Sequence, residues 1–151
     1  MRKGLKQIYI LTLVGTLTIT LPASAQLLIN EFSAMNNRIM IDSMTKDYSD
    51  WIEIENISER TINLEGYYLS DDPDQLLKYK IPEETMIKPG HQFIFIANGK
   101  GSSNQLNFKL SVDGEFILLS ESEGNIIDSV QYQDQQAGIT SIADSRIENI
   151  I

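Results

Sequence analysis

The chain has 151 residues, enough for one domain, and its 42% apolar and 22% charged residues exclude disordered and low-complexity classes. Twenty-one acidic against twelve basic residues give a net charge of −9, which disfavours nucleic-acid partners because phosphates require a basic face. The absence of cysteine excludes disulfide scaffolds, thiolate metal sites and thiol catalysis, and a single histidine excludes mechanisms that need two imidazoles.

Residues 1–25 have the features of a secretory signal peptide. Three basic residues open the chain, residues 8–21 are mainly apolar, and Ala23-Ser24-Ala25 supplies the small residues that precede a cleavage site. The apolar run, about 14 residues, is shorter than the roughly 20 that a membrane-spanning helix needs. We therefore expect cleavage before Gln26, export to the periplasm or the exterior of a bacterial cell, no stable membrane anchor, and a mature net charge of −12.

The mature chain alternates short strand-like segments with turn residues, and no segment has a helical apolar period. In the segment 51–56, Ile52 and Ile54 are expected on one face of a strand and the glutamates between them on the other. Residues 93–97 are apolar at every position, which predicts a strand in the middle of a sheet, buried on both faces. The predicted strands cover residues 27–32, 51–56, 61–64, 67–69, 76–81, 93–97, 107–110, 115–119 and 126–132.

This pattern of strands predicts an all-β fold, an immunoglobulin-like β-sandwich, with a small antiparallel barrel as the alternative. The order and spacing of several motifs also resemble the bacterial branch of the lamin tail domain family, which implies the same sandwich fold. These motifs are Ile29-Asn30-Glu31-Phe32, residues 50–56, residues 63–72, Ile87-Lys88-Pro89-Gly90, Phe108-Lys109-Leu110-Ser111, Asp113-Gly114-Glu115 and Ile127-Asp128-Ser129-Val130.

The resemblance covers about residues 27–132 and then departs from the family pattern. Residues 138–141 begin the Ser-x-Gly-Arg segment that usually follows, but residues 142–146 do not complete it. We therefore expect a domain over residues 26–135 and a C-terminal tail over residues 136–151 with an incomplete last strand. Bacterial members are commonly modules of longer secreted proteins, so a truncated accessory module of a larger secreted hydrolase is an alternative reading.

Three carboxylates lie close together at Asp71, Asp72 and Asp74. Carboxylates clustered in a loop can ligate Ca²⁺, which takes hard oxygen ligands in flexible geometry, so these residues are calcium candidates. The spacing lacks the glycine and the distal glutamate of a calcium-binding loop, and Asp and Pro favour β-turns. A turn is therefore the favoured interpretation, and we expect no cofactor other than this candidate calcium ion.

Three aromatic residues, Trp51, Tyr67 and Tyr68, are candidates for ligand binding. Exposed rings on a sheet face stack on sugars or anchor a protein partner. Core packing is the alternative, because one of two adjacent tyrosines in a strand must point inward. We expect Trp51 to be partly buried and one of the two tyrosines to lie at the surface, without a choice between them.

Catalytic interpretations rest on Glu31, Glu53 and Glu55, which the resemblance places near each other on two strands. A carboxylate pair can perform acid–base catalysis, as in glycosidases. A solvated strand face is the favoured interpretation because no other part of a hydrolase site is present. His91 follows a Pro-Gly turn and is expected to be exposed. We therefore predict no catalytic residue and no enzymatic activity, with a carboxylate-based glycan hydrolase as the alternative.

The export signal and the resemblance together predict a secreted, non-enzymatic module of the bacterial cell envelope that binds, tethers or has a structural role. The partners that the resemblance implies are proteins or glycans at the cell surface. Lamin tails in nuclei contact DNA through a basic surface, which this acidic chain lacks, so nucleic acid is not expected among the partners.

Overall fold

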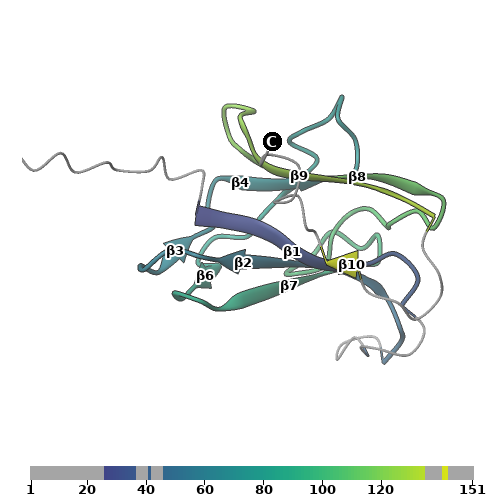
Figure 1. Cartoon of the computed structure of the whole chain (residues 1–151), viewed down its shortest axis with the longest axis horizontal. Coiled ribbons are helices and arrows are strands. Elements are labelled where there is room, and N and C mark those ends of the chain that lie inside the picture. Colours follow the sequence, from purple (N-terminus) through teal and green to yellow (C-terminus); the bar gives the residue numbers. More distant parts are fainter. Residues whose placement is uncertain (1–25, 37–40, 42–45, 135–140, 143–151) are drawn as a thin grey trace, which may run out of the picture.

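The structure is a computed structural model that describes residues 26–36, 41, 46–134 and 141–142. Two four-stranded antiparallel sheets face each other, in the orders β10-β1-β2-β7 (the first sheet) and β5-β4-β8-β9 (the second sheet), and β3 pairs with β6 beside them (Figure 1). The strands are β1 (Leu27–Ser33), β2 (Asp50–Asn56), β3 (Ile62–Asn63), β4 (Tyr67–Ser70), β5 (Tyr79–Lys80), β6 (Met86–Ile87), β7 (Gln92–Ala97), β8 (Gly114–Glu121), β9 (Ile126–Gln133) and β10 (Ser141–Ile142).

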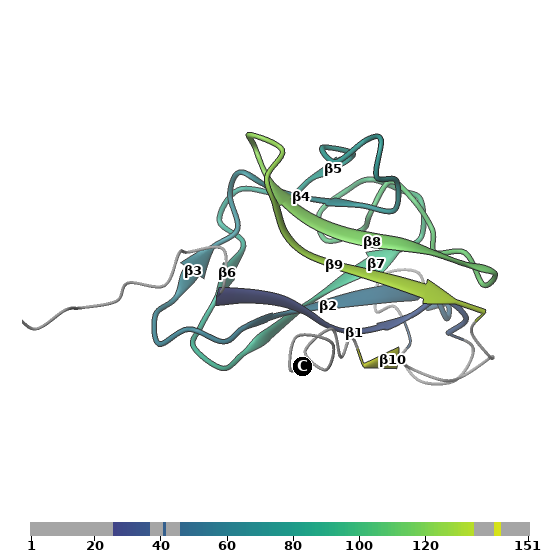
Figure 2. The ribbon, with the colours of Figure 1, turned by 45° about the horizontal axis from the view of Figure 1, so that its top comes forward.

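The predicted sandwich is confirmed, and the barrel alternative is wrong because the two sheets stay separate. Apolar side chains from the inner faces of both sheets fill the space between the layers, as the period of two along each strand requires. The layers approach each other where β9 lies beside β1 (Figure 2). There the ring centroids of Phe32 and Tyr132 are 4.6 Å apart.

Strand β2 has the alternation that the sequence predicts. Ile52 and Ile54 are fully buried in the core, whereas Glu53 and Glu55 lie half-buried on the outer face. β2 pairs with β1 on one side and with β7 on the other, so it lies in the middle of the first sheet. A β-bulge at Asn30 shifts the register of β1 against β2.

The prediction for residues 93–97 is wrong in one respect, because β7 is an edge strand. Phe95 is fully buried in the core, but Phe93 and Ile94 are only half-buried. A loop runs along the outer edge of β7: the Ile96 N–H donates to the carbonyl of Asn104 at 2.8 Å, and the Leu106 N–H donates to the carbonyl of Ile96 at 2.7 Å. This loop gives apolar side chains at an edge the cover that a neighbouring strand would provide.

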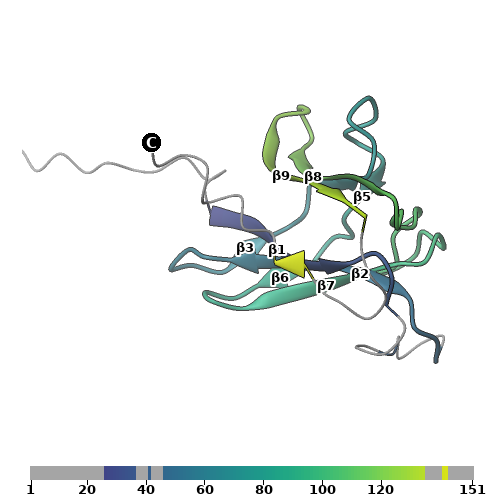
Figure 3. The same cartoon turned by 45° about the vertical axis from the view of Figure 1, so that its right-hand side comes forward.

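Several short elements differ from the sequence-based expectation. Residues 107–110 form no strand, the segment 76–81 contributes only the two residues of β5, and β6 had no counterpart in the prediction. Of the predicted tail, Ser141 and Ile142 form β10 against β1 (Figure 3). The predicted signal peptide, residues 1–25, and the rest of the tail lie outside the described residues.

Candidate binding site

A cavity of about 290 Å³ opens at the end of the sandwich where β2 begins and β7 ends. Two segments that are far apart in the sequence supply its walls: residues 47–50, which lead into β2, and residues 97–109, which follow β7. We call it the Tyr48 cavity, and it is lined by Asp47, Tyr48, Ser49, Asp50, Ala97, Asn98, Lys100 and Lys109.

Asp50 is the half-buried carboxylate of the Tyr48 cavity and links the two loops. Its Oδ1 accepts a hydrogen bond from the backbone N–H of Asn36 at 3.3 Å, and the backbone of Leu110 also bonds to this carboxylate. Burial raises the pKa of Asp50, and these hydrogen bonds and the charge of Lys109 oppose the rise. The carboxylate therefore connects the two segments that form the cavity.

The chemistry of the Tyr48 cavity suits a polar ligand. The Tyr48 side chain is 45% exposed, so its ring can stack on a ligand. Acidic, basic, amide and hydroxyl groups surround it, and Ala97 gives a small apolar floor. A sugar ring or a polar peptide segment presents both an apolar face and hydrogen-bonding groups, so either matches this lining.

A second cavity, of about 240 Å³, lies at the opposite end of the sandwich, where β1 begins and β2 ends. We call it the Arg60 cavity. It contains the predicted ligand-binding residue Tyr67, whose ring packs against the core and whose pKa is raised first by burial and then by the charge of Glu121. The residues that line it are Gln26, Arg60, Thr61, Ile62, Asn63 and Tyr67.

The other two aromatic candidates lie outside both cavities. Trp51 was expected to be partly buried, but its side chain is only 4% exposed and leaves almost no surface for a ligand. Its indole Nε1–H is buried and has no hydrogen-bond partner among the residues that the structure describes. Tyr68 points to the outer face of the second sheet, opposite to the core-facing Leu69, and is half-buried.

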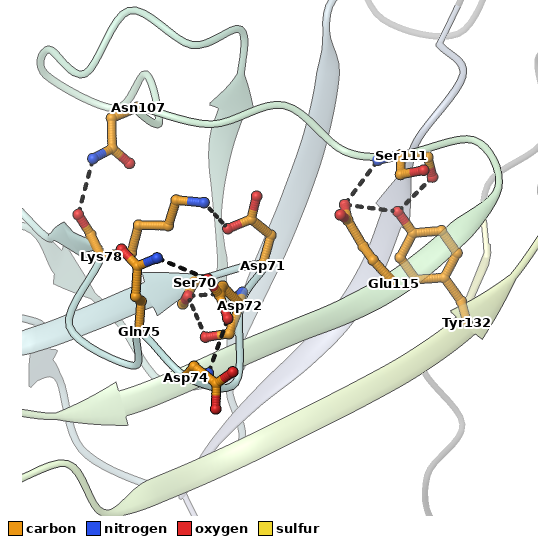
Figure 4. Close-up of polar contacts among 10 residues, drawn as sticks. All are labelled: Ser70, Asp71, Asp72, Asp74, Gln75, Lys78, Asn107, Ser111, Glu115 and Tyr132. Atoms are coloured by element: carbon orange, nitrogen blue, oxygen red, sulfur yellow. Dashed lines mark hydrogen bonds and ion pairs between the residues drawn. The ribbon is translucent and has the colours of Figure 1, made fainter.

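The three calcium candidates form a hydrogen-bonded turn after β4 (Figure 4). Asp72 Oδ1 accepts the backbone N–H of Asp74 at 2.9 Å, and Oδ2 accepts the side-chain amide of Gln75 at 2.8 Å. Asp71 forms an ion pair with Lys78, with 2.5 Å between Oδ1 and Nζ. Within the described part of the chain, no group of three or more His, Asp or Glu side chains is arranged to hold a metal ion. The turn is the interpretation that the sequence favours, and calcium binding stays an untested alternative.

Glu115 forms a second half-buried carboxylate network near this turn (Figure 4). Its Oε1 accepts the backbone N–H of Ser111 at 2.8 Å and the hydroxyl of Tyr132 at 3.1 Å. The Tyr132 hydroxyl also lies 2.8 Å from the carbonyl of Ser111. Burial raises the pKa of Glu115, and burial followed by the charge of Glu115 raises the pKa of Tyr132.

The glutamates considered for catalysis lie on the outer face of the first sheet. Glu31 stands opposite Glu53 in the register of β1 and β2, and the side-chain amide of Asn30 donates to Glu53 Oε1 at 2.8 Å. Neither Glu31, Glu53 nor Glu55 lines the two cavities. His91 is exposed, as expected, and its Nδ1 lies 2.9 Å from the carbonyl of Pro89.

Comparison with known families decides the affiliation of the chain. The sequence model of the lamin tail domain matches residues 20–134. The chain belongs to the lamin tail domain family. This match confirms the resemblance drawn from the motifs, and the family is a non-catalytic one with an immunoglobulin-like fold. No curated protein matches the chain.

The motif residues of this lamin tail domain hold turns and sheets together. Asn56 is fully buried, and its side-chain amide donates to the carbonyls of Arg60 at 2.7 Å and Ile87 at 2.8 Å. From the last motif, Asp128 Oδ2 accepts the backbone N–H of Ile29 at 2.8 Å and so links the two sheets. These contacts explain why the motifs identify the fold while leaving the ligand undefined.

Sequence reasoning missed the Tyr48 cavity of this lamin tail domain. In the sequence, Asp50 is visible only as part of a motif, and Tyr48 belongs to a segment without a clear pattern. The residues 97–109 that complete the cavity come from a loop about 50 positions further along the chain, and no local periodicity records that pairing.

None of the described residues forms an apolar helix of membrane-spanning length.

Proposed function

We propose that this lamin tail domain is an exported, non-enzymatic module that binds a protein or a glycan at the bacterial cell surface through the Tyr48 cavity. The observation that carries the proposal is the composition of that cavity, in which an exposed aromatic ring lies beside polar groups of both charges. The non-catalytic character of the family supports a binding role. The predicted signal peptide supports export.

Export has a direct test. The full chain, expressed with its own leader in a bacterial host, is expected outside the cytoplasm with an N-terminal sequence that begins at Gln26. N-terminal sequencing of the fractionated protein provides the measurement. A cytoplasmic protein that still begins at Met1 would contradict export and leave binding at the cell surface without support.

Binding is tested on isolated bacterial cell walls, either untreated or stripped of protein by a protease. We expect the exported protein to bind untreated walls, with retention on stripped walls if the ligand is a glycan and loss if it is a protein. Tyr48→Ala should weaken binding by about tenfold, because it removes the stacking surface. Met86→Ala is the control, since Met86 is also an exposed large side chain but lies at the other end of the sandwich. Equal binding by Tyr48→Ala and the unaltered protein would refute the proposed site.

A carboxylate-based glycan hydrolase is the second candidate, and one observation favours it. Asp47 and Asp50 line the same cavity, and burial raises the pKa of Asp50, as a general acid requires. Against this role, Asp50 already accepts backbone hydrogen bonds that hold the two loops. Incubation of cell-wall glycan with the exported protein separates the two functions: release of reducing ends that Asp50→Asn abolishes would favour the hydrolase over the binding module.

A further inference from the structure

The Arg60 cavity lies on a different surface from the Tyr48 cavity, at the far end of β2. Asp50 at one end of β2 lines the first cavity, and Asn56 at the other end bonds to the backbone of Arg60, which lines the second. These two residues are the ends of the seven-residue strand β2, and six steps of about 3.3 Å place them about 20 Å apart. An inference about the Arg60 cavity therefore does not rest on the function proposed above.

The guanidinium of Arg60 is held in one orientation by Gln26. Nε and Nη2 both donate to the side-chain oxygen of Gln26, at 3.3 Å and 3.1 Å. This contact uses the side of the guanidinium that carries Nε and leaves the Nη1–Nη2 edge available. Within the described residues no carboxylate forms an ion pair with Arg60. A preorganised guanidinium edge is the group that binds a carboxylate through two parallel hydrogen bonds.

Two hydroxyl groups complete the donor set of the Arg60 cavity. The ring of Tyr67 is fixed by its packing against the core, and within the described residues its hydroxyl makes no hydrogen bond. Thr61 adds a second, exposed hydroxyl, and Ile62 supplies an apolar wall. Among the side chains that line the cavity, only that of Arg60 is charged, and cleavage before Gln26 would add the positive charge of the new N-terminus beside it. The charges of Arg60 and Glu121 both act on Tyr67, in opposite directions, so Arg60 attracts an anion in this cavity and Glu121 repels it from the far side.

We propose that the Arg60 cavity binds the carboxylate group of a small ligand or of a chain end. The Nη1–Nη2 edge of Arg60 takes both carboxylate oxygens, and the rest of the bound group lies against Tyr67 and Ile62. A volume of about 240 Å³ accommodates one sugar or one terminal amino-acid residue. The same chemistry is offered by an acidic sugar and by the C-terminus of a peptide.

Two matched pairs of probes test the proposal by nuclear magnetic resonance titration of the full chain expressed with its own leader. The first pair is glucuronic acid and glucose, and the second is an acetylated dipeptide with a free C-terminus and the same dipeptide as its amide. We expect the carboxylate member of at least one pair to shift the backbone amide signals of residues 60–63 and the Nε–H signal of Arg60. The neutral members should leave these signals unchanged.

Variants distinguish binding by the guanidinium group of Arg60 from attraction by any positive charge. Arg60→Gln should abolish the shifts, and Arg60→Lys should weaken binding by about tenfold because an ammonium group lacks the planar fork. Lys88→Gln is the control: it removes an exposed cation at the same end of the molecule that does not line the cavity, and it should leave the affinity unchanged. Arg60 is exposed, so its replacement should preserve the fold, which the spectrum itself reports.

Each outcome of the titration has a defined meaning. Shifts with glucuronic acid alone identify an acidic-sugar site, shifts with the free dipeptide alone identify a chain-end site, and shifts with both identify a general carboxylate site. The proposal is overturned if no carboxylate probe shifts these signals at its highest soluble concentration. Equal shifts with the neutral probes, or shifts that persist in Arg60→Gln, also overturn it.

Discussion

Gly114 shows how one residue can be fixed by the space around it as well as by its backbone. It opens β8 with φ +96°, and a Cβ added there would lie 2.6 Å from the carbonyl oxygen of Tyr132 and 2.7 Å from Cα of Gln133. Gly66 has a similar φ of +85°, but nothing lies within 4 Å of the corresponding position. Substitution of Gly66 therefore measures the cost of a left-handed backbone alone, and substitution of Gly114 adds the cost of a collision with the neighbouring strand.

We expect Gly114→Ala to lower the free energy of unfolding by about 2–4 kcal/mol, since it combines backbone strain with displacement of β9. Gly66→Ala should cost only about 1 kcal/mol, the strain alone. Urea unfolding followed by circular dichroism measures both losses. Equal losses in the two variants would show that β9 moves away from Gly114 without cost.

Glu115 should make the stability of the domain depend on pH. Its pKa in the folded protein is raised by burial, so folding favours the protonated carboxyl group. The stability that this group contributes is fully present below its unfolded pKa, about 4.3, and is lost as the pH rises through the higher folded pKa. Glu115→Gln, whose side chain is uncharged at every pH, should therefore lose less stability than the unaltered protein between pH 4 and pH 7.

The measurement is urea unfolding at several pH values, and the quantity compared is the change in unfolding free energy between pH 4 and pH 7. Glu59→Gln is the control, because Glu59 is exposed and should leave the difference unchanged. An identical pH dependence in Glu115→Gln and the unaltered protein would contradict the assignment.

Strand β7 has one face in the core and an edge that a loop covers. We expect Phe95→Ala to lower the unfolding free energy by about 3–5 kcal/mol, because Phe95 is fully buried between the sheets and its removal leaves a cavity. Ile94→Ala should cost less, since Ile94 is half-buried on the outer face. Denaturant unfolding gives both values. A loss below about 1 kcal/mol for Phe95→Ala would mean that β7 contributes little to the core.

Some properties of the elements follow from local sequence and others do not. The alternation of Ile52 and Ile54 with glutamates predicts which face of β2 is buried, because strand side chains repeat with a period of two. The apolar run in β7 does not reveal whether the strand is central or at an edge, because a loop from residues 102–106 supplies the missing cover. Strands of two residues, such as β6, are too short to show any period.

The residues of the candidate sites can likewise be sorted into those that the local sequence reveals and those that it does not. Tyr67 could be selected from the sequence as an aromatic residue in a strand, and it does line a cavity. Arg60, which lines the same cavity, could not be selected from the sequence, because a single arginine in a loop belongs to no recognisable pattern. Gln26, which directly precedes β1 and is 34 positions away from Arg60, lines the same cavity through a contact that only the folded chain creates.

Calcium binding, if it occurs, should raise the stability of the entire domain. The carboxylates of Asp71 and Asp72 already bond to Lys78, to Gln75 and to the backbone, so we expect no calcium-dependent change in Tm. A ligand present at ten times its Kd would add about 1.4 kcal/mol to the folded state, which thermal melting detects. The experiment compares calcium with a chelator in the full chain. A rise in Tm that Asp72→Asn abolishes would establish a calcium site instead.

The position of β2 between the two cavities has a mechanical consequence. A ligand held at each cavity would pull on the first sheet along the axis of β2, which pairs with β1 and β7 through six residue positions each. The ladder hydrogen bonds on both sides of β2 would then carry the load together in shear and would not open one after another. β10, which pairs with β1 through two positions, lies beside this path and would be the first strand to peel away under a force applied to the C-terminal end of the chain. We therefore expect the domain to resist a pulling force along β2 and to lose the pairing of β10 with β1 first.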